Sequence, residues 1–231
     1  MISIKTKSIL FVLSIVVVVI SISLLYVESS YNKEILIKKT FPSDYVDLSK
    51  FIPDLVIDVR YATSNNFMNR VLKGYKSPRA LMLRSAAQRL KRVQKSLKSK
   101  GYSLKIFDAY RPMRAERDMI DWSLKKKYRI RYLREGYVPA RVWPGRKIGH
   151  VSGNTVDLTL VDSHGKEINM GTAFDAFTKK SWTSNAKGTV LKNRLLLKKV
   201  MEAEGFRNYY REWWHFVHPQ YPSQAQDFVI E

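Results

Sequence analysis

The chain contains no cysteine among its 231 residues. This absence excludes disulfide bridges, a zinc site made of thiolates, a cysteine nucleophile and a lipid anchor on cysteine. Histidine is also scarce, with four residues, so each one can be considered singly as a metal ligand or a base. The sequence has no internal repeat and no low-complexity tract. Its length and its 45% of apolar residues suit one globular domain with a sizeable core.

Acidic residues are few relative to basic ones. The chain has 20 Asp and Glu against 41 Lys and Arg, which gives a formal charge of +21. Such a charge favours contact with polyanions such as nucleic acid, anionic lipid or an acidic wall polymer. The basic residues are spread thinly, with short runs at 38–39, 125–127 and 198–199 and no long basic arm. We therefore expect a solvated basic surface, at most loose contact with an anionic wall or lipid surface, and no nucleic-acid partner.

The sequence has one long apolar run, residues 9–27, which follows Lys5 and Lys7 and is interrupted only by serines. As a helix with a rise of about 1.5 Å per residue, it is nearly long enough to cross a bilayer. It predicts an N-terminal apolar helix within residues 1–27, either a membrane anchor or a signal peptide. We favour the anchor, because the only cleavage site that follows is a weak one at 27–29. Both alternatives export the rest of the chain to a periplasmic or other extracytoplasmic location.

The remaining chain divides into a polar tether, residues 28–50, and a domain, residues 51–231. Apolar and turn-rich segments predict strands at 55–60, 103–107, 155–160 and 215–217, with 166–170 as a hairpin partner of the third. Helices are predicted at 81–100, from Pro112 to about residue 127, and at 191–204. Because strands and helices alternate irregularly and hairpins are expected, the fold class is α+β.

Two histidines lie near carboxylates in the sequence. His150 and Asp157 are seven residues apart, a spacing that would put them on opposite faces of a regular strand. The intervening turn at Gly153 breaks that register and can fold the strand of Asp157 back beside His150. A carboxylate inside the apolar strand 155–160 is costly unless it is paired or bound to a metal. The alternative is a surface histidine and a salt-bridged aspartate.

The second such pair is Glu212 and His215, which flank Trp213 and Trp214. Indole walls exclude water and lower the local dielectric, which can raise the pKa of the Glu212 carboxyl group. A carboxylate of raised pKa suits a general base that acts on metal-activated water. The alternative is an aromatic core cluster with an exposed charged neighbour.

Together these residues match a catalytic zinc site, which takes three protein ligands and leaves a position for water. The ligand number is satisfied by His150, Asp157 and His215. Glu212 is then left as the base. His164, in a Ser-His-Gly turn, and His218, before a proline, are predicted not to be ligands.

Arg111 lies where a predicted strand ends and a helix begins, which is a common position for site residues. A guanidinium at that position can stabilise the oxyanion of a tetrahedral intermediate. The alternative is a structural bridge to Asp108 or a contact at the helix start.

Three motifs together resemble the zinc D-alanyl-D-alanine dipeptidases, the family that includes the vancomycin-resistance dipeptidase. The motifs are Asp108-x-Tyr110-Arg111-Pro112, His150-x6-Asp157 and Glu212-x-Trp214-His215. Residues 52–63, 65–67 and 170–175 resemble further segments of the family, so that the likeness covers about residues 51–220. It implies a compact single α+β domain with a central antiparallel sheet flanked by helices.

The resemblance also implies a role for each motif residue. It implies that Zn²⁺ is held by His150, Asp157 and His215. It implies that Glu212 is the catalytic base and that Arg111 stabilises the transition state. The substrate pocket would include Tyr61, Asp108 and Asp175. The implied reaction is hydrolysis of a small dipeptide, D-Ala-D-Ala or a similar D-amino-acid dipeptide.

One residue departs from the family pattern. Ile148 stands where the family usually has a serine, two residues before the first histidine. The missing hydroxyl bears on substrate preference and turnover rather than on the metal site. Two other functions stay open: a D,D-carboxypeptidase that trims peptidoglycan peptides, and a non-catalytic basic module that binds the cell wall. The segment 61–67 resembles the dipeptidase group and favours a closed pocket.

Overall fold

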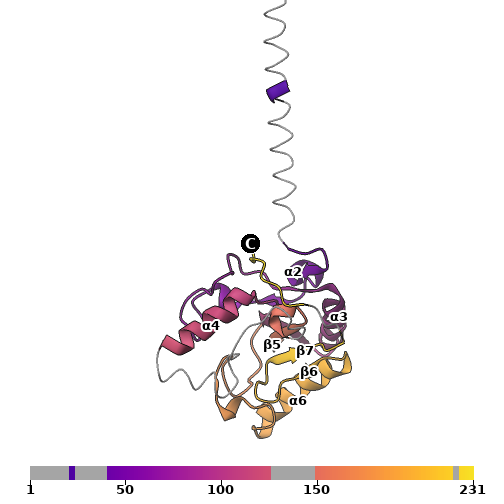
Figure 1. Ribbon diagram of the computed structural model, residues 1–231. Helices are drawn as coiled ribbons and strands as arrows, with labels where there is room; N and C mark the ends of the chain where they lie inside the picture. The colour runs from indigo at the N-terminus through magenta and orange to yellow at the C-terminus, as the bar shows by residue number, and fades with distance from the viewer. Residues whose placement is uncertain (1–20, 24–40, 126–148, 221–223) are drawn as a thin grey trace, which may run out of the picture. The chain divides into compact units, whose positions relative to one another are not determined.

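The computed structural model describes residues 21–23, 41–125, 149–220 and 224–231. The chain forms two units, Met1–Thr40 and Phe41–Glu231, and the second contains the sheets and helices discussed below (Figure 1). Only residues 21–23 of the predicted apolar segment are described, so the predicted N-terminal helix lies outside the described residues. Within the described ranges, no helix is long and apolar enough to cross a membrane.

The second unit is an α+β domain built on a five-stranded sheet of order β2-β4-β5-β7-β6. Its strands are β2 (Val56–Ile57), β4 (Tyr102–Asp108), β5 (Thr155–Asp162), β7 (His215–Val217) and β6 (Arg207–Asn208). The neighbours from β4 to β6 pair antiparallel, whereas β2 runs parallel to β4. The expected antiparallel sheet is therefore corrected to a mixed one. A long connection that includes a helix joins β2 to β4, and such a crossover returns the chain in the same direction.

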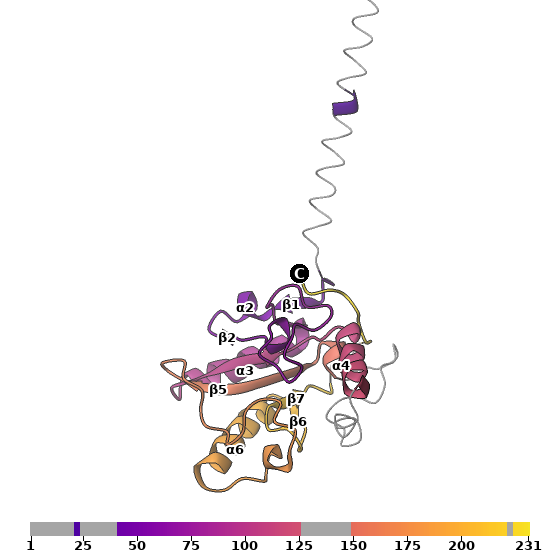
Figure 2. The same ribbon diagram turned by 90° about the vertical axis from the view of Figure 1, so that its left-hand side faces the viewer.

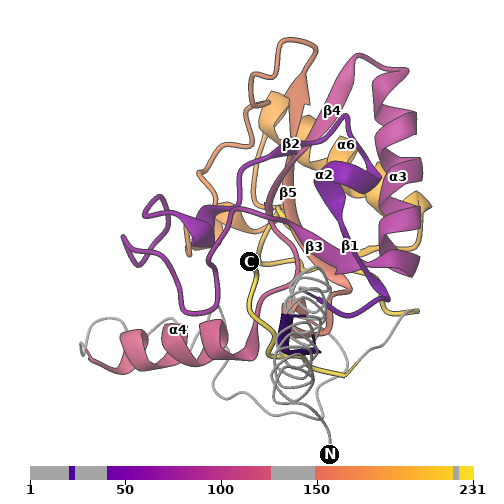
Figure 3. The same ribbon diagram turned by 90° about the horizontal axis from the view of Figure 1, so that it is seen from above.

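Within the described residues, four helices and a small second sheet accompany this sheet. The helices are α2 (Leu48–Phe51), α3 (Arg84–Lys98), α4 (Met113–Lys125) and α6 (Gly188–Ala203). The second sheet pairs β1 (Tyr45–Asp47) with β3 (Leu81–Leu83) antiparallel. Helix α3 contacts both β4 and α6. Figures 2 and 3 show α4 apart from α3 and α6, at another side of the domain.

Helix α3 has the predicted apolar face, because Leu90, Val93 and Leu97 are fully buried. It begins at Arg84 rather than at residue 81, since Leu81–Leu83 form β3. All three residues of β3 are buried. Periodicity alone does not separate a short, fully buried strand from a buried helical turn, which explains the difference.

The domain includes residues that the sequence analysis placed in the tether. Tyr45, Val46 and Leu48 are buried in the core, and β1 is paired along its whole length. The compact unit accordingly begins at Phe41. A strand of three residues followed by one helical turn is too short to show a hydrophobic period, so the sequence pattern did not reveal it.

Two predicted strands differ from the structure. The strand predicted at 55–60 is limited to β2, and the chain then enters a 3-10 turn at Arg60–Ala62. Residues 166–170 form no strand, although an isolated bridge joins Val161 to Glu167 and the Ile168 amide donates to the Leu160 carbonyl. The expected hairpin therefore consists of a few hydrogen bonds beside β5.

Asp118 of α4 binds residues 70–73, which follow Tyr61 and Phe67 in the chain. Arg70 donates to both carboxylate oxygens of Asp118, at 2.7 and 2.9 Å, and the Lys73 amide donates at 3.2 Å. Burial acts to raise the pKa of Asp118, but these hydrogen bonds outweigh it and lower that pKa. A carboxylate whose pKa is lowered on folding stabilises the fold above its unfolded pKa of about 3.9, and the contribution is lost as the pH falls.

We therefore expect Asp118→Asn to lower the melting temperature at pH 7, with a difference that shrinks as the pH falls below the unfolded pKa of about 3.9. Thermal unfolding at a series of pH values measures it. The control is Asp121→Asn, an exposed aspartate of the same helix. A loss of the same size at pH 3 and pH 7 would contradict a contribution from the carboxylate charge.

Candidate metal centre

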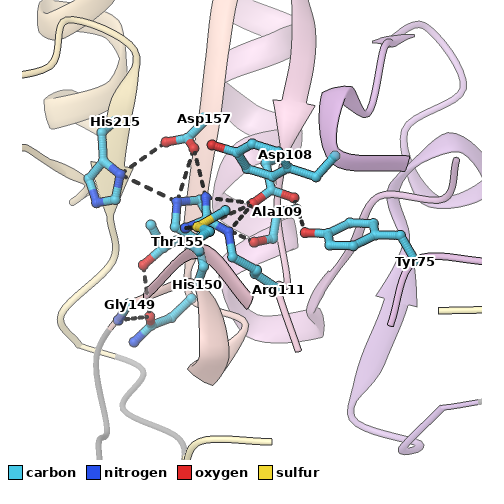
Figure 4. Close-up of polar contacts among 12 residues, drawn as sticks. Tyr75, Asp108, Ala109, Arg111, Gly149, His150, Thr155, Asp157 and His215 are labelled. Carbon is cyan, nitrogen blue, oxygen red and sulfur yellow. Dashed lines mark hydrogen bonds and ion pairs between the residues drawn. The ribbon is translucent and has the colours of Figure 1, made fainter. Parts of the chain in front are cut away.

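Three predicted donors converge in the domain, although 65 residues separate His150 from His215. His150 Nε2 lies 3.1 Å from Asp157 Oδ2 and 3.3 Å from His215 Nδ1 (Figure 4). His215 Nδ1 lies 3.0 Å from Asp157 Oδ1. One donor atom from each residue lies within 4.8 Å of the others, so that a single ion can contact all three.

Strand register brings two of these donors together. In the β5–β7 ladder Asp157 lies opposite His215, and in the β4–β5 ladder Asp157 lies opposite Asp108. His150 reaches the same place from the 3-10 turn His150–Ser152, which ends at Gly153 with φ 69°. A Cβ at Gly153 would clash with the Tyr45 ring, so glycine is required there both for its backbone angle and for space. The predicted fold-back of the Asp157 strand beside His150 is confirmed.

The hydrogen bonds of His150 set its tautomer. His150 Nδ1 lies 2.6 Å from the carbonyl oxygen of Ala109, which can only accept, so Nδ1 carries the proton. Nε2 then presents its lone pair towards Asp157 and His215. This is the arrangement typical of a metal-ligating histidine, whose other nitrogen donates to a carbonyl or carboxylate.

The chemistry of the donor set fits Zn²⁺. Burial lowers the pKa of His215, which favours its neutral, ligating form. Burial acts to raise the pKa of Asp157, but His150 and His215 outweigh it and hold that pKa far below its usual value. Two imidazole nitrogens and one carboxylate oxygen form the three-ligand set of a catalytic zinc site.

Arg111 is buried beside these donors. Its Nη2 lies 2.9 Å from Asp108 Oδ2 and 3.4 Å from Asp157 Oδ2, and its guanidinium stacks on the Tyr61 ring at 4.7 Å. The structural bridge to Asp108, which the sequence analysis left open, is therefore present, and Arg111 lines the pocket as well. Asp108 in turn accepts from the Tyr75 hydroxyl at 2.6 Å. Tyr75 belongs to none of the three motifs, so the sequence analysis missed it.

Seven of the eight predicted site residues line one pocket of about 230 Å³; they are Tyr61, Arg111, His150, Asp157, Asp175, Glu212 and His215. The eighth, Asp108, lies behind Arg111. Glu116, Phe177 and Tyr209 also line the pocket, and the sequence analysis missed them because they lie outside the chemical motifs. Ile148, where the sequence departs from the family pattern, lies outside the described residues.

The family model described as D-ala-D-ala dipeptidase, Peptidase M15, matches residues 42–230. The chain belongs to this family. It is 31% identical over 191 residues to the D-alanyl-D-alanine dipeptidase of Enterococcus faecalis, a match that covers 75% of this chain and 91% of that relative. The corresponding match to the D-alanyl-D-alanine dipeptidase of Escherichia coli is also 31% over 191 residues, with coverage of 80% and 92%. A solved LD-carboxypeptidase, LdcB, matches with a TM-score of 0.43 and 22% identity over 77% of this chain and 68% of its own. The resemblance that the three motifs carry is thus confirmed.

The carboxylates of this family member's pocket differ in their tendency to bind protons. Burial raises the pKa of Glu212 well above its ordinary value, and Asp157 and Asp175 raise it further, against the opposing effect of Arg111. Burial and Asp157 likewise raise the pKa of Asp175, whose carboxylate lies 3.1 Å from the Tyr61 hydroxyl. Among these three carboxylates of the pocket, Asp157 therefore stays ionised, whereas Asp175 and Glu212 bind protons readily or accept a cation.

Proposed function

We propose that this chain hydrolyses D-Ala-D-Ala, or a similar D-amino-acid dipeptide, with Zn²⁺ held by His150, Asp157 and His215. Family membership and the names of the relatives support the reaction. One observation carries the substrate class: the half-buried carboxylate of Asp175 lines the same small pocket as the three donors. A carboxylate there suits a substrate whose ammonium group lies close to its scissile bond, which is the property of a dipeptide.

The size of the pocket supports a short substrate. Pockets for drug-sized molecules have volumes of about 300–1,000 Å³. This pocket, at about 230 Å³, lies below that range. A D,D-carboxypeptidase has to accommodate the rest of a wall peptide on the amino side of the bond, where Asp175 and Tyr61 lie in this proposal.

Each residue of the pocket has a separate role in the proposed hydrolysis. Zinc, when bound, supplies Lewis acidity that polarises the peptide carbonyl and activates water. The Glu212 carboxylate is desolvated, and its Oε2 lies 3.7 Å from His215 Nδ1. It takes the proton of the attacking water and passes it to the leaving amine. Arg111 offers its guanidinium to the developing oxyanion, and Asp108 holds it in place. Asp175 binds the substrate ammonium, while the Tyr61 hydroxyl orients its carboxylate.

The test compares substrates on the zinc-loaded full-length chain. We expect D-Ala-D-Ala to be hydrolysed, and N-acetyl-D-Ala-D-Ala to have a kcat/KM lower by about 10–100-fold, since a charge-assisted hydrogen bond contributes about 1.5–3 kcal/mol. A wall pentapeptide that ends in D-Ala-D-Ala should be poorer still. Trimming of the pentapeptide at a similar kcat/KM would indicate the carboxypeptidase. Absence of turnover together with salt-sensitive wall binding would indicate the basic module.

We further propose that the domain acts outside the cytoplasm, where it salvages dipeptide released from the wall. The apolar run 9–27 behind Lys5 and Lys7 supports this location. Fractionation of cells that express the native chain tests it. Recovery of the enzyme in the cytosol would overturn the proposal.

A further inference from the structure

Arg194, on α6, is a buried arginine that has no carboxylate partner in the part of the chain that the structure describes. Its side chain is 1% exposed, and within the described residues it forms no ion pair. Its four hydrogen bonds to described residues all go to backbone carbonyls. Nε and Nη2 donate to the Met170 carbonyl at 2.8 and 2.6 Å, Nη2 to that of Lys180 at 3.0 Å, and Nη1 to that of Trp182 at 2.8 Å.

These carbonyls mark the two ends of one loop, residues 170–182. A single guanidinium thus joins the start of the loop, at Met170, to its end at Lys180 and Trp182. The rigid fork of five N–H donors is the feature that lets arginine hold several acceptors in a fixed geometry. Arg194 therefore closes the base of this loop.

The same loop base is held to the segment that carries Glu212. The Trp213 indole donates to the Thr172 hydroxyl at 2.9 Å, and that hydroxyl lies 2.9 Å from the Ser181 hydroxyl. The loop also lies close to α6, because a Cβ at Gly171, where φ is 79°, would stand 2.6 Å from Val190 Cγ1. The two ends of the loop are thus held by contacts with α6 and with Trp213, the residue next to Glu212.

Asp175 lies in this loop in a conformation that needs support. Its φ of 59° is in the left-handed region, which costs free energy for a residue other than glycine. Its carboxylate is half-buried, and the Asp157 and Asp108 carboxylates repel it. If the two ends of the loop were not held together, Asp175 could move out of the pocket into water. The carboxylate therefore stays in the pocket only while the ends of the loop are joined.

We infer that Arg194 is a positioning residue, which holds loop 170–182 closed so that Asp175 stays in the pocket and binds the substrate ammonium. The identity of the ligand rests on the proposed function, whereas the closure of the loop does not. The inference predicts an effect on substrate affinity rather than on the chemical step or on zinc.

The main variant is Arg194→Lys, which keeps the charge but not the fork that reaches three carbonyls. We expect KM for D-Ala-D-Ala to rise by about tenfold or more, as for loss of a charge-assisted hydrogen bond. We expect kcat to change by less than about threefold, and the zinc Kd measured by chelator competition to stay unchanged. The matched control is Arg92→Lys, an exposed arginine on α3 that is paired with Glu204. A fall in kcat with KM unchanged would overturn the inference.

A double-mutant cycle tests whether the effect passes through Asp175. Residues that act through one contact show non-additive effects. Arg194→Lys should therefore raise KM little further in an Asp175→Asn background. Full additivity of the two substitutions would overturn the inference. If Arg194→Lys does not fold, Gly171→Ala, which forces the loop base away from α6, should raise KM in the same way and take its place in the cycle.

Amide hydrogen exchange tests the loop without any substrate. In the lysine variant, exchange should accelerate at Phe177, Thr178 and Ser181, whose amides bond within the loop, and not across β4 and β5. Unchanged exchange in the loop would overturn the inference. If a Glu212→Gln chain fails to bind D-Ala-D-Ala in calorimetry, the proposed function fails, and the exchange data alone then decide whether Arg194 closes the loop.

Discussion

Glu212→Gln is expected to lower kcat for D-Ala-D-Ala by about 10²–10⁴-fold, the usual contribution of a general base. Glutamine keeps the shape of the side chain in its buried position but cannot take a proton from water. The zinc content should not change, because His150, Asp157 and His215 supply the donors that converge on one point. Steady-state kinetics on the zinc-loaded chain, with metal content measured on the same sample, checks both statements.

The control for this substitution is Glu204→Gln, a glutamate paired with Arg89 and Arg92 away from the pocket. Its kcat should stay within about threefold of the unsubstituted chain. A Glu212→Gln enzyme that kept kcat within tenfold would remove Glu212 as the base. Loss of zinc from that variant would instead make the glutamate a ligand, and the proposed division of roles would be wrong.

His215→Ala is expected to raise the zinc Kd by more than about 100-fold and to remove activity at stoichiometric zinc. Loss of a residue that only supports a ligand costs about 10–100-fold in metal affinity, so loss of a ligand should cost more. The substitution also takes a partner from the buried Asp157 carboxylate, 3.0 Å away. Chelator competition measures the affinity, and a zinc titration of activity shows whether excess metal restores turnover.

The matched control is His164→Ala, which removes a histidine from an exposed turn. Its zinc affinity and kcat should equal those of the unsubstituted chain. If His215→Ala kept the original zinc affinity, His215 would not be a ligand. The proximity of its ring to His150, with centroids 5.0 Å apart, would then be a packing contact only.

The sequence by itself determined the chemistry of this protein. The residue types and spacing of the motifs around Arg111, His150 and Glu212 were enough to predict the family, which the comparison confirmed. The buried face of α3 followed from its periodicity, because a helix packed on one side places apolar residues at three- and four-residue steps. Such signals depend on residues that lie close together in the chain, so they can be recognised in a single sequence.

Only the tertiary structure decided how distant residues meet. The register of β4, β5 and β7 places Asp108, Asp157 and His215 side by side, and β2 joins the sheet in parallel through a crossover. Tyr75 and Arg194 support the site through hydrogen bonds to residues 33 and up to 24 positions away. Contacts of this kind depend on how the chain returns on itself and leave no periodic pattern, which is why the sequence did not reveal them.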